Sequence, residues 1–483
     1  MISKPRIIYI ISGFAILSLL LWRIADGSWV SSAPNAVIPE ITIDKFTLDN
    51  GLTVIIHEDH RSPLVAINIW YHVGSKDEKP DKHGLAHLCE HLMFSGAEHL
   101  NQDLLKVIEG LGATNYNGTT DRDRTRFFMD VPPSALDTAL WLESDRMGYS
   151  HGAITQKKLD QARIEVEEES QAAGNREKIG DRKSPYDFVE VFLASRTFPS
   201  GHNYSWHPLR SIEGLKSISL ADVKEWFRNY YCPSNTVLVL AGDIDTPTTR
   251  DKVKKYFAFL QPGKALNREL ASLPRPYHLR RQSIVAAVSS PRIYKVWNVP
   301  GYADPDVDYL DLLRHVLNSR LQARLIDQER LGTSVSVSLK SYELCGQFQI
   351  EATASAGADL AVIERIIDQQ LDELLAQGPT TKELELIKTE LLSSFLSDIE
   401  QIGGSGGKSD ILAISEVFAG DPHHYKKANQ RLQAAGPEAV KAIGSRWLSD
   451  CAFVLYIKKL PEYKASSVDV DRSSAPGISR SNP

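Results

Sequence analysis

Residues 84–94 read Gly-Leu-Ala-His-Leu-Cys-Glu-His-Leu-Met-Phe, and the rest of the chain is best interpreted outward from this stretch. Its pattern predicts a helix. His87 and His91 are four residues apart, so their imidazoles lie one above the other on one helix face. Glu90 points toward the same side. Two imidazoles so placed can bind a zinc ion, and a carboxylate beside the metal can take a proton from a bound water.

A catalytic zinc ion usually has a third protein ligand and an open fourth position. Residues 155–173 are predicted to form another helix, which carries an acidic run. One glutamate of this run would complete a site with two histidines and one carboxylate. The alternatives are a surface pair or satisfied core residues for the two histidines, and a solvated helix face for the acidic run. The run consists of Glu165, Glu167, Glu168 and Glu169.

Several blocks of the chain, in a fixed order, resemble the pitrilysin-type inverzincins, which include insulysin, pitrilysin, mitochondrial processing peptidase and bacterial relatives. The resemblance covers roughly residues 42–460. The blocks are Trp70-x3-Gly74-Ser75-x2-Glu78, the motif from Gly84 to Gly96, Thr125-Arg-Phe-Phe128, Gly201-His-Asn-Tyr204, Phe227-x2-Tyr230-Tyr231-x-Pro233-x-Asn235 and Val239-Leu-Ala-Gly242-Asp243.

The resemblance implies a zinc-dependent endopeptidase in which His87, His91 and a distant glutamate hold the metal and Glu90 is the general base. The usual family spacing, about 76 residues after the second histidine, selects Glu168 as the metal ligand. The position of Arg163 fits Glu169 better, so Glu169 is the alternative. A helper glutamate of the family is replaced here by Gln161 or Ala162.

The resemblance also implies how a peptide or unfolded polypeptide would bind. Family members bind their substrate as an added strand on an exposed sheet edge. The matching stretch is residues 115–120, in which Asn117 and Gly118 are the expected substrate contacts. An ordinary Asn-Gly turn is the alternative interpretation.

One pair of family residues is missing from the second half. Active single-chain relatives carry an arginine and, seven positions later, a tyrosine, which contact the substrate near zinc. Ile326 and Thr333 occupy these positions here. In two-subunit relatives one chain bears the zinc motif and the other supplies the pair. We therefore expect a homologous partner subunit that contributes the arginine and the tyrosine.

The order of predicted elements indicates an α+β protein built from two homologous α/β-sandwich units. Strands over 41–48 and 52–57 are joined by Asp49-Asn50-Gly51, a hairpin signal. Each half then repeats strands, two helices, strands, long helices and a closing strand, so we expect a mainly antiparallel sheet with helices packed on it. The expected domains are a zinc-bearing unit (41–261), a linker (262–277), a second homologous unit (278–462) and a disordered tail (463–483).

The N-terminus differs in composition from the rest. Lys4 and Arg6 precede an apolar run over residues 7–22. This pattern predicts a signal peptide or membrane anchor over residues 1–25, followed by a tether over 26–40. The positive flank predicts that the following domains are translocated, which indicates a periplasmic protein or one anchored in the inner membrane and facing the periplasm.

The charge balance narrows the choice of partners. The chain has 483 residues and a formal net charge of −6, with no long basic run, so we expect no nucleic-acid partner. The sequence leaves two functional classes open. One is an active zinc endopeptidase, and the other is a non-catalytic scaffold or assembly subunit that retains the fold.

Overall fold

The computed structural model describes residues 38–175, 185–186, 188–206, 212–266, 268, 273–274, 280–449 and 452–460. The expected signal or anchor segment, most of the tether and the tail therefore lie outside the described residues. Within the described ranges, no helix combines the length and apolar character needed to cross a bilayer.

The first half of the chain forms a six-stranded sheet with the order β1-β2-β6-β3-β5-β4. Strand β2 pairs with β6 in parallel, and the other neighbours are antiparallel. The predicted hairpin is present, and Gly51 adopts a φ of 88° in its turn. The strands are β1 (Asp44–Thr47), β2 (Thr53–Glu58), β3 (Val65–Tyr71), β4 (Thr114–Thr120), β5 (Thr125–Val131) and β6 (Thr236–Gly242).

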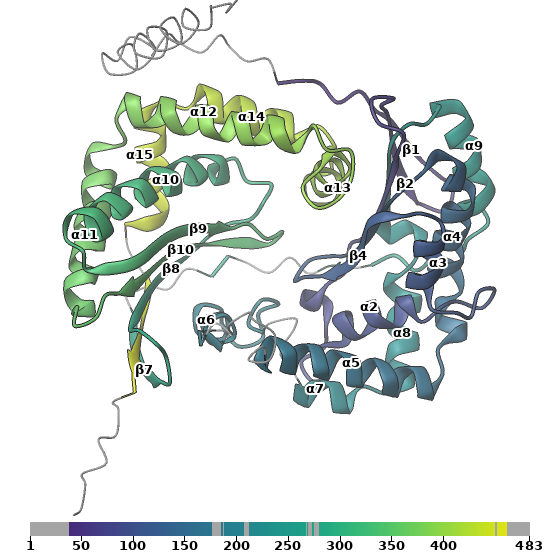
Figure 1. Cartoon of the computed structure of the whole chain (residues 1–483), viewed down its shortest axis with the longest axis horizontal. Coiled ribbons are helices and arrows are strands. Elements are labelled where there is room, and N and C mark those ends of the chain that lie inside the picture. The colour runs from purple at the N-terminus through teal and green to yellow at the C-terminus, as the bar shows by residue number, and fades with distance from the viewer. Residues whose placement is uncertain are drawn as a thin grey trace, which may run out of the picture.

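The second sheet repeats this topology, with five strands in the order β7-β11-β8-β10-β9. Strand β7 pairs with β11 in parallel, and the other neighbours are antiparallel, as in the first sheet. The expected pair of units with mainly antiparallel sheets is therefore confirmed, and Figure 1 shows them side by side. The strands are β7 (Arg280–Ala286), β8 (Arg292–Pro300), β9 (Gly332–Lys340), β10 (Cys345–Ala354) and β11 (Phe453–Lys459).

Helices pack on both sheets. Those of the first half are α2 (Leu85–Phe94), α3 (Leu104–Gly110), α4 (Leu136–Ala153), α5 (Gln156–Asn175), α6 (Phe188–Thr197), α7 (Ile212–Ser217), α8 (Leu220–Tyr230) and α9 (Thr246–Phe257). Those of the second half are α10 (Asp306–Leu321), α11 (Leu360–Gln377), α12 (Thr381–Asp398), α13 (Lys408–Ala419), α14 (His424–Ala434) and α15 (Pro437–Leu448). The segment Gln322–Gln328, directly after α10, is a π-helix.

The two faces of the first sheet are covered by different parts of the chain. One face packs on its own helices, including α2 and α4. The other face is covered by α13 from the second half, which packs against β3 and β6. Buried ion pairs reinforce this contact, because Lys408 bonds to Asp59 and Asp410 bonds to Arg126. The apolar cluster at this contact contains Ile41, Ile55, Trp70, Val237, Val239, Ile399, Leu412, Ala413 and Tyr425.

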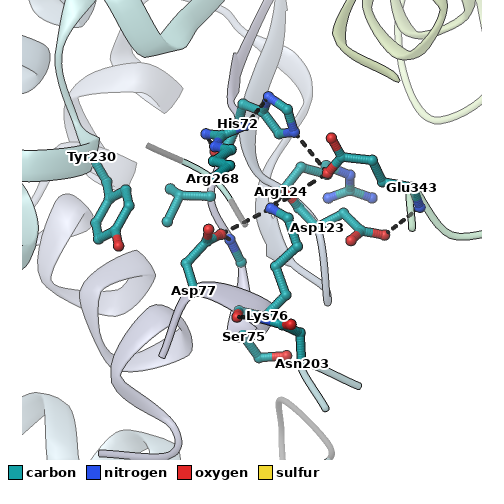
Figure 2. Close-up of polar contacts among 12 residues, drawn as sticks. His72, Ser75, Lys76, Asp77, Asp123, Arg124, Asn203, Tyr230, Arg268 and Glu343 are labelled. Carbon is teal, nitrogen blue, oxygen red and sulfur yellow. Dashed lines mark hydrogen bonds and ion pairs between the residues drawn. The ribbon is translucent and has the colours of Figure 1, made fainter. Parts of the chain in front are cut away.

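A second contact joins the halves through the turn between β9 and β10 (Figure 2). Glu343 in this turn accepts a hydrogen bond from His72 Nε2 at 2.8 Å and lies 3.5 Å from Lys76 Nζ. The backbone N–H of Glu343 donates to Asp123 Oδ2 at 3.0 Å. Burial alone would raise the pKa of Glu343, but His72 and Lys76 outweigh it and lower that pKa. The turn is therefore anchored as an anion among donors of the first half.

Candidate metal centre and peptide-binding edge

The backbone turns sharply at Gly84, directly before helix α2. Gly84 precedes it with a φ of 91°, a conformation that favours glycine. The carboxylate of Glu78 caps the helix, because its Oε1 accepts the N–H groups of Gly84 at 3.1 Å and Ala86 at 3.0 Å. Leu88 and Leu92 are fully buried and fix the helix rotation. This rotation turns the motif face toward α5, which packs against α2.

The side chains of His87, His91 and Glu169 converge between α2 and α5. The Nε2 atoms of the two histidines lie 3.3 Å apart. Oε2 of Glu169 lies 3.1 Å from His91 Nε2 and 3.4 Å from His87 Nε2. Within the described part of the chain, these three residues form the group of donors able to hold a metal ion.

The geometry selects Glu169, whereas the sequence analysis preferred Glu168. The buried side chains of Ala162 and Val166 define the face of α5 that turns toward the core. Glu169 is three residues after Val166 and shares this side, whereas Glu168 is two residues after it and lies about 200° around the helix. The position of Arg163 was thus a better guide than the count from His91.

Burial and charge set the protonation preferences of the site. Burial raises the pKa of Glu90, although the neighbouring His87 opposes the shift. The hydrogen bonds from His87 and His91 hold the pKa of Glu169 far below its usual range. Burial alone would lower the pKa of His91, but Glu169, Glu90 and Glu165 together outweigh it and raise that pKa. The site therefore concentrates negative charge around two nitrogen donors.

These donors fit a zinc ion. Tetrahedral ligands at about 2.0–2.1 Å from zinc are about 3.3 Å from one another, and the three donor atoms here are separated by 3.1 to 3.4 Å. One carboxylate and two imidazole nitrogens also match a zinc site that keeps an open position. The residues present therefore suit the metal that the family implies.

The metal centre borders a cavity of about 510 Å³ that reaches strand β4. Within the first sheet β4 is an edge strand, paired with β5. Asn117 and Gly118 line this cavity together with the metal-site residues, as does Glu90. A Cβ at Gly118 would collide with the rings of Phe94 and Phe127, so the close approach requires glycine. Asn117 and Gly118 belong to a strand and not to an Asn-Gly turn.

Some neighbours of the site were not singled out from the sequence. Thr120 lines the cavity beside Glu90, and Leu105 adds an apolar wall. The carboxylate of Glu165 lies 3.6 Å from His91 Nδ1. Glu165 belongs to the acidic run named from the sequence, and its position four residues before Glu169 puts both carboxylates on one helix face.

The positions expected for the missing arginine and tyrosine lie in the second half. Ile326 packs against the core of the second unit. Thr333 is in β9, where its hydroxyl lies 3.5 Å from the carbonyl oxygen of Thr353. Neither residue lines the cavity at the metal centre.

Comparisons with known proteins agree with this arrangement. Residues 53–182 match the family model described as insulinase (peptidase family M16), and residues 217–391 match the one described as peptidase M16 inactive domain. The zinc protease PqqE of Helicobacter pylori is 25% identical over 389 residues, which cover 77% of this chain and 84% of that protein.

Solved structures show the same fold. A protease from Helicobacter pylori superimposes with a TM-score of 0.77 at 23% identity and covers 87% of this chain and 100% of that one. The first half of the periplasmic protease PqqL from Escherichia coli gives a TM-score of 0.70 at 18% identity, covering 88% of this chain and 93% of that one. With both halves matched in order, the chain belongs to the insulinase (M16) family of zinc peptidases.

Proposed function

We propose that the chain is a zinc-dependent endopeptidase that cleaves peptides or unfolded polypeptides. The observation that carries this proposal is the convergence of His87, His91 and Glu169 at a cavity that also contains Glu90 and the sheet edge β4. Ligands, base and peptide-binding edge thus meet in one place. The proposed zinc ligands are these three residues, one ion per chain.

Each group has a chemical task in this proposal. A zinc ion held at this site supplies a bound water with a pKa lowered to about 7. Glu90 lines the same cavity and would take a proton from the attacking water, and burial raises the pKa of this carboxyl. The same carboxyl then passes the proton to the leaving amide nitrogen. The carboxylate of Glu169 stays ionised and holds the two imidazoles together.

The substrate is proposed to bind as an extended strand along β4. An edge strand presents unpaired backbone donors and acceptors that a peptide can use regardless of its sequence. Asn117 and Gly118 are the proposed contacts beside the metal. A relative in structure, PqqL, is described as periplasmic, and together with the apolar N-terminal run this supports a periplasmic or membrane-anchored location.

A homologous partner subunit is part of the proposal. Attack on a peptide carbonyl places negative charge on its oxygen, and loss of one donor to such an oxygen typically costs about 10²–10³ in rate. Ile326 has no donor, and Thr333 is a short side chain already directed to Thr353. A partner that supplies an arginine and a tyrosine would restore this stabilisation.

A non-catalytic scaffold is the second candidate. It is favoured by Ile326 and Thr333 and by the description of the family model that matches residues 217–391 as an inactive domain. The intact ligand set and the buried Glu90 favour the peptidase.

The deciding experiment compares the natural chain with Glu90→Gln, alone and with the homologous partner. Zinc content is measured by elemental analysis, and turnover is measured on quenched fluorescent peptides. We expect one zinc ion in both proteins and a loss of about 10²–10⁴ in turnover for Glu90→Gln. Glu167→Gln is a matched control on α5 that should behave like the natural chain. Zinc binding without turnover, even with the partner, would establish the scaffold.

A further inference from the structure

A second cavity, of about 400 Å³, opens at the other end of β4. It lies between the first sheet and the glycine-rich loop that joins α12 to α13. Its wall includes Asn115 at the start of β4, Asp130 on β5 and Gly403 in the loop. Neither the ligand set nor the proposed base reaches this cavity, so the proposed chemistry does not explain it.

Asp130 is the unusual group in this wall. Its side chain is almost wholly buried, with an exposed fraction of 6% for the residue. Asn115 Nδ2 donates to its Oδ2 at 2.9 Å. Among the described residues, no lysine, arginine or histidine lies within ion-pair distance of this carboxylate. Burial therefore raises its pKa, opposed by the hydrogen bond from Asn115. A buried carboxylate without a counter-charge is costly, which makes a cationic ligand favourable.

Glycine at position 403 lets the loop approach one oxygen of this carboxylate closely. A Cβ at position 403 would collide with Oδ1 of Asp130 and with the Cβ of Ala66. The loop is held in place by Arg126, which donates to Ser405 Oγ at 2.7 Å and also bonds to Asp410. Gly403 therefore belongs to a fixed loop that packs closely on Asp130, and both residues line the cavity.

The other charges at the cavity are already balanced against one another. Arg61 bonds to Asp59 through Nε at 2.9 Å and Nη2 at 2.8 Å, and through Nη1 to Glu400 at 3.1 Å. Lys408 also bonds to Asp59. The charges of Arg61 and Lys408 thus balance those of Asp59 and Glu400. Within the described ranges, the carboxylate of Asp130 has no such balancing cation.

The cavity reaches the start of β4, so it would lie near one end of a peptide bound along that strand. Asn117 pairs with Phe128, and Thr114 pairs with Asp130, with a register shift between them where Asn115 has a φ of 48°. Such a bulge re-aims side chains at a strand end. Alternate side chains of an added strand point to each face. Five residues separate Asn115 from Thr120, which is about 17 Å of strand.

We propose that this cavity is a subsite for a cationic group of the peptide substrate, about four to six residues from the cleaved bond. The inference rests on the proposed peptidase function and on binding along β4. Two sources share this chemistry, namely a lysine or arginine side chain within the peptide and a free amino group at its N-terminus. Asp130 would accept hydrogen bonds from that group.

The experiment uses the full chain, with its partner where turnover requires it. Blocked peptides carry a single lysine at each position from three to seven residues on either side of the cleaved bond, with glutamine in the matched peptide. We expect one position at which lysine raises kcat/KM about 10-fold, mainly through KM, and Asp130→Asn should abolish this gain. Glu438→Gln, an exposed carboxylate on α15, is the control and should keep it.

Other outcomes distinguish the two possible cationic groups. They also distinguish a failure of the proposed subsite from a failure of the proposed peptidase function. If only a peptide with an unblocked N-terminus gains, the amino terminus is the ligand. Another outcome is that the peptides are cleaved while neither lysine at any position nor a free N-terminus changes kcat/KM. In that case the subsite proposal is wrong, and the peptidase proposal is unaffected. Binding of the same peptides to Glu90→Gln, followed by fluorescence anisotropy, needs no turnover. Equal affinity for all lysine, glutamine and unblocked peptides there would overturn the subsite even if no peptide is cleaved.

Discussion

Each unit contains a corresponding pair of helices, α2 with α5 in the first unit and α10 with α12 in the second. The two pairs are held together by different chemistry. In the first unit, Glu169 on α5 faces His87 and His91 on α2. In the second unit, Glu383 on α12 accepts two hydrogen bonds from Arg320 on α10, at 2.7 and 2.9 Å. One junction gathers three side chains able to hold a metal ion, and the other is a closed ion pair.

Three side chains on α10 have the same intervals as the motif on α2 but different chemistry. Asp311, Arg314 and His315 on α10 repeat the intervals of the two histidines and the glutamate on α2. Arg314 Nε donates to Asp311 at 2.5 Å, so these two side chains neutralise each other. Burial lowers the pKa of His315. The same topology thus holds a candidate metal site in one copy and a structural contact in the other, because a site depends on the side chains and not on the fold.

The largest expected effect tests the first junction. Glu169→Gln removes a proposed metal ligand, whereas Glu168→Gln changes an exposed neighbour. Loss of an outer-shell partner typically weakens metal binding 10- to 100-fold, so we expect Glu169→Gln to weaken zinc binding by more than about 100-fold. Titration against a competing chelator measures this affinity. Weakening confined to Glu168→Gln would return the ligand to the position counted from His91.

The second junction should respond to acid and not to zinc. Arg320 and Thr380 lower the pKa of Glu383 to about 2. A lowered carboxyl pKa stabilises the fold above its unfolded pKa of about 4.3, and this stabilisation is lost as the pH falls through 2. After a discount for partial exposure, we expect Glu383→Gln to lose about 1 kcal/mol at pH 7. Its unfolding free energy should depend less on pH between about 5 and 2, with zinc affinity unchanged.

The smallest expected effect concerns the residues that only repeat the spacing. Arg314→Ala breaks a partly exposed pair on one helix, so the cost should be about 0.5 kcal/mol or less. Zinc content and peptide turnover should stay at the level of the natural chain. A fall in either would mean that the second unit takes part in the site, and the contrast between the units would fail.

Local signals in the sequence were sufficient for much of the first unit. The Asp49-Asn50-Gly51 turn and the motif helix depend on neighbours within a few residues, and both form as predicted. The rotation of α5 depends on its packing against α2, which the sequence does not state, and Glu168 was therefore preferred over Glu169. Helix α13 was not predicted as a separate element, because its buried face contacts strands more than 150 residues earlier in the chain.

The cover that α13 provides has a consequence for the order of folding during synthesis. Ile55, Trp70 and Val239 leave the ribosome long before residues 408–419 do, and domains fold as they emerge. Until then, these apolar residues on the outer face of the first sheet lack the cover of α13. A chain stopped after residue 266 would retain that exposed face and be prone to aggregate. The half that carries the His-x-x-Glu-His motif is made first, yet the outer face of its sheet is covered only after residues 408–419 have been made.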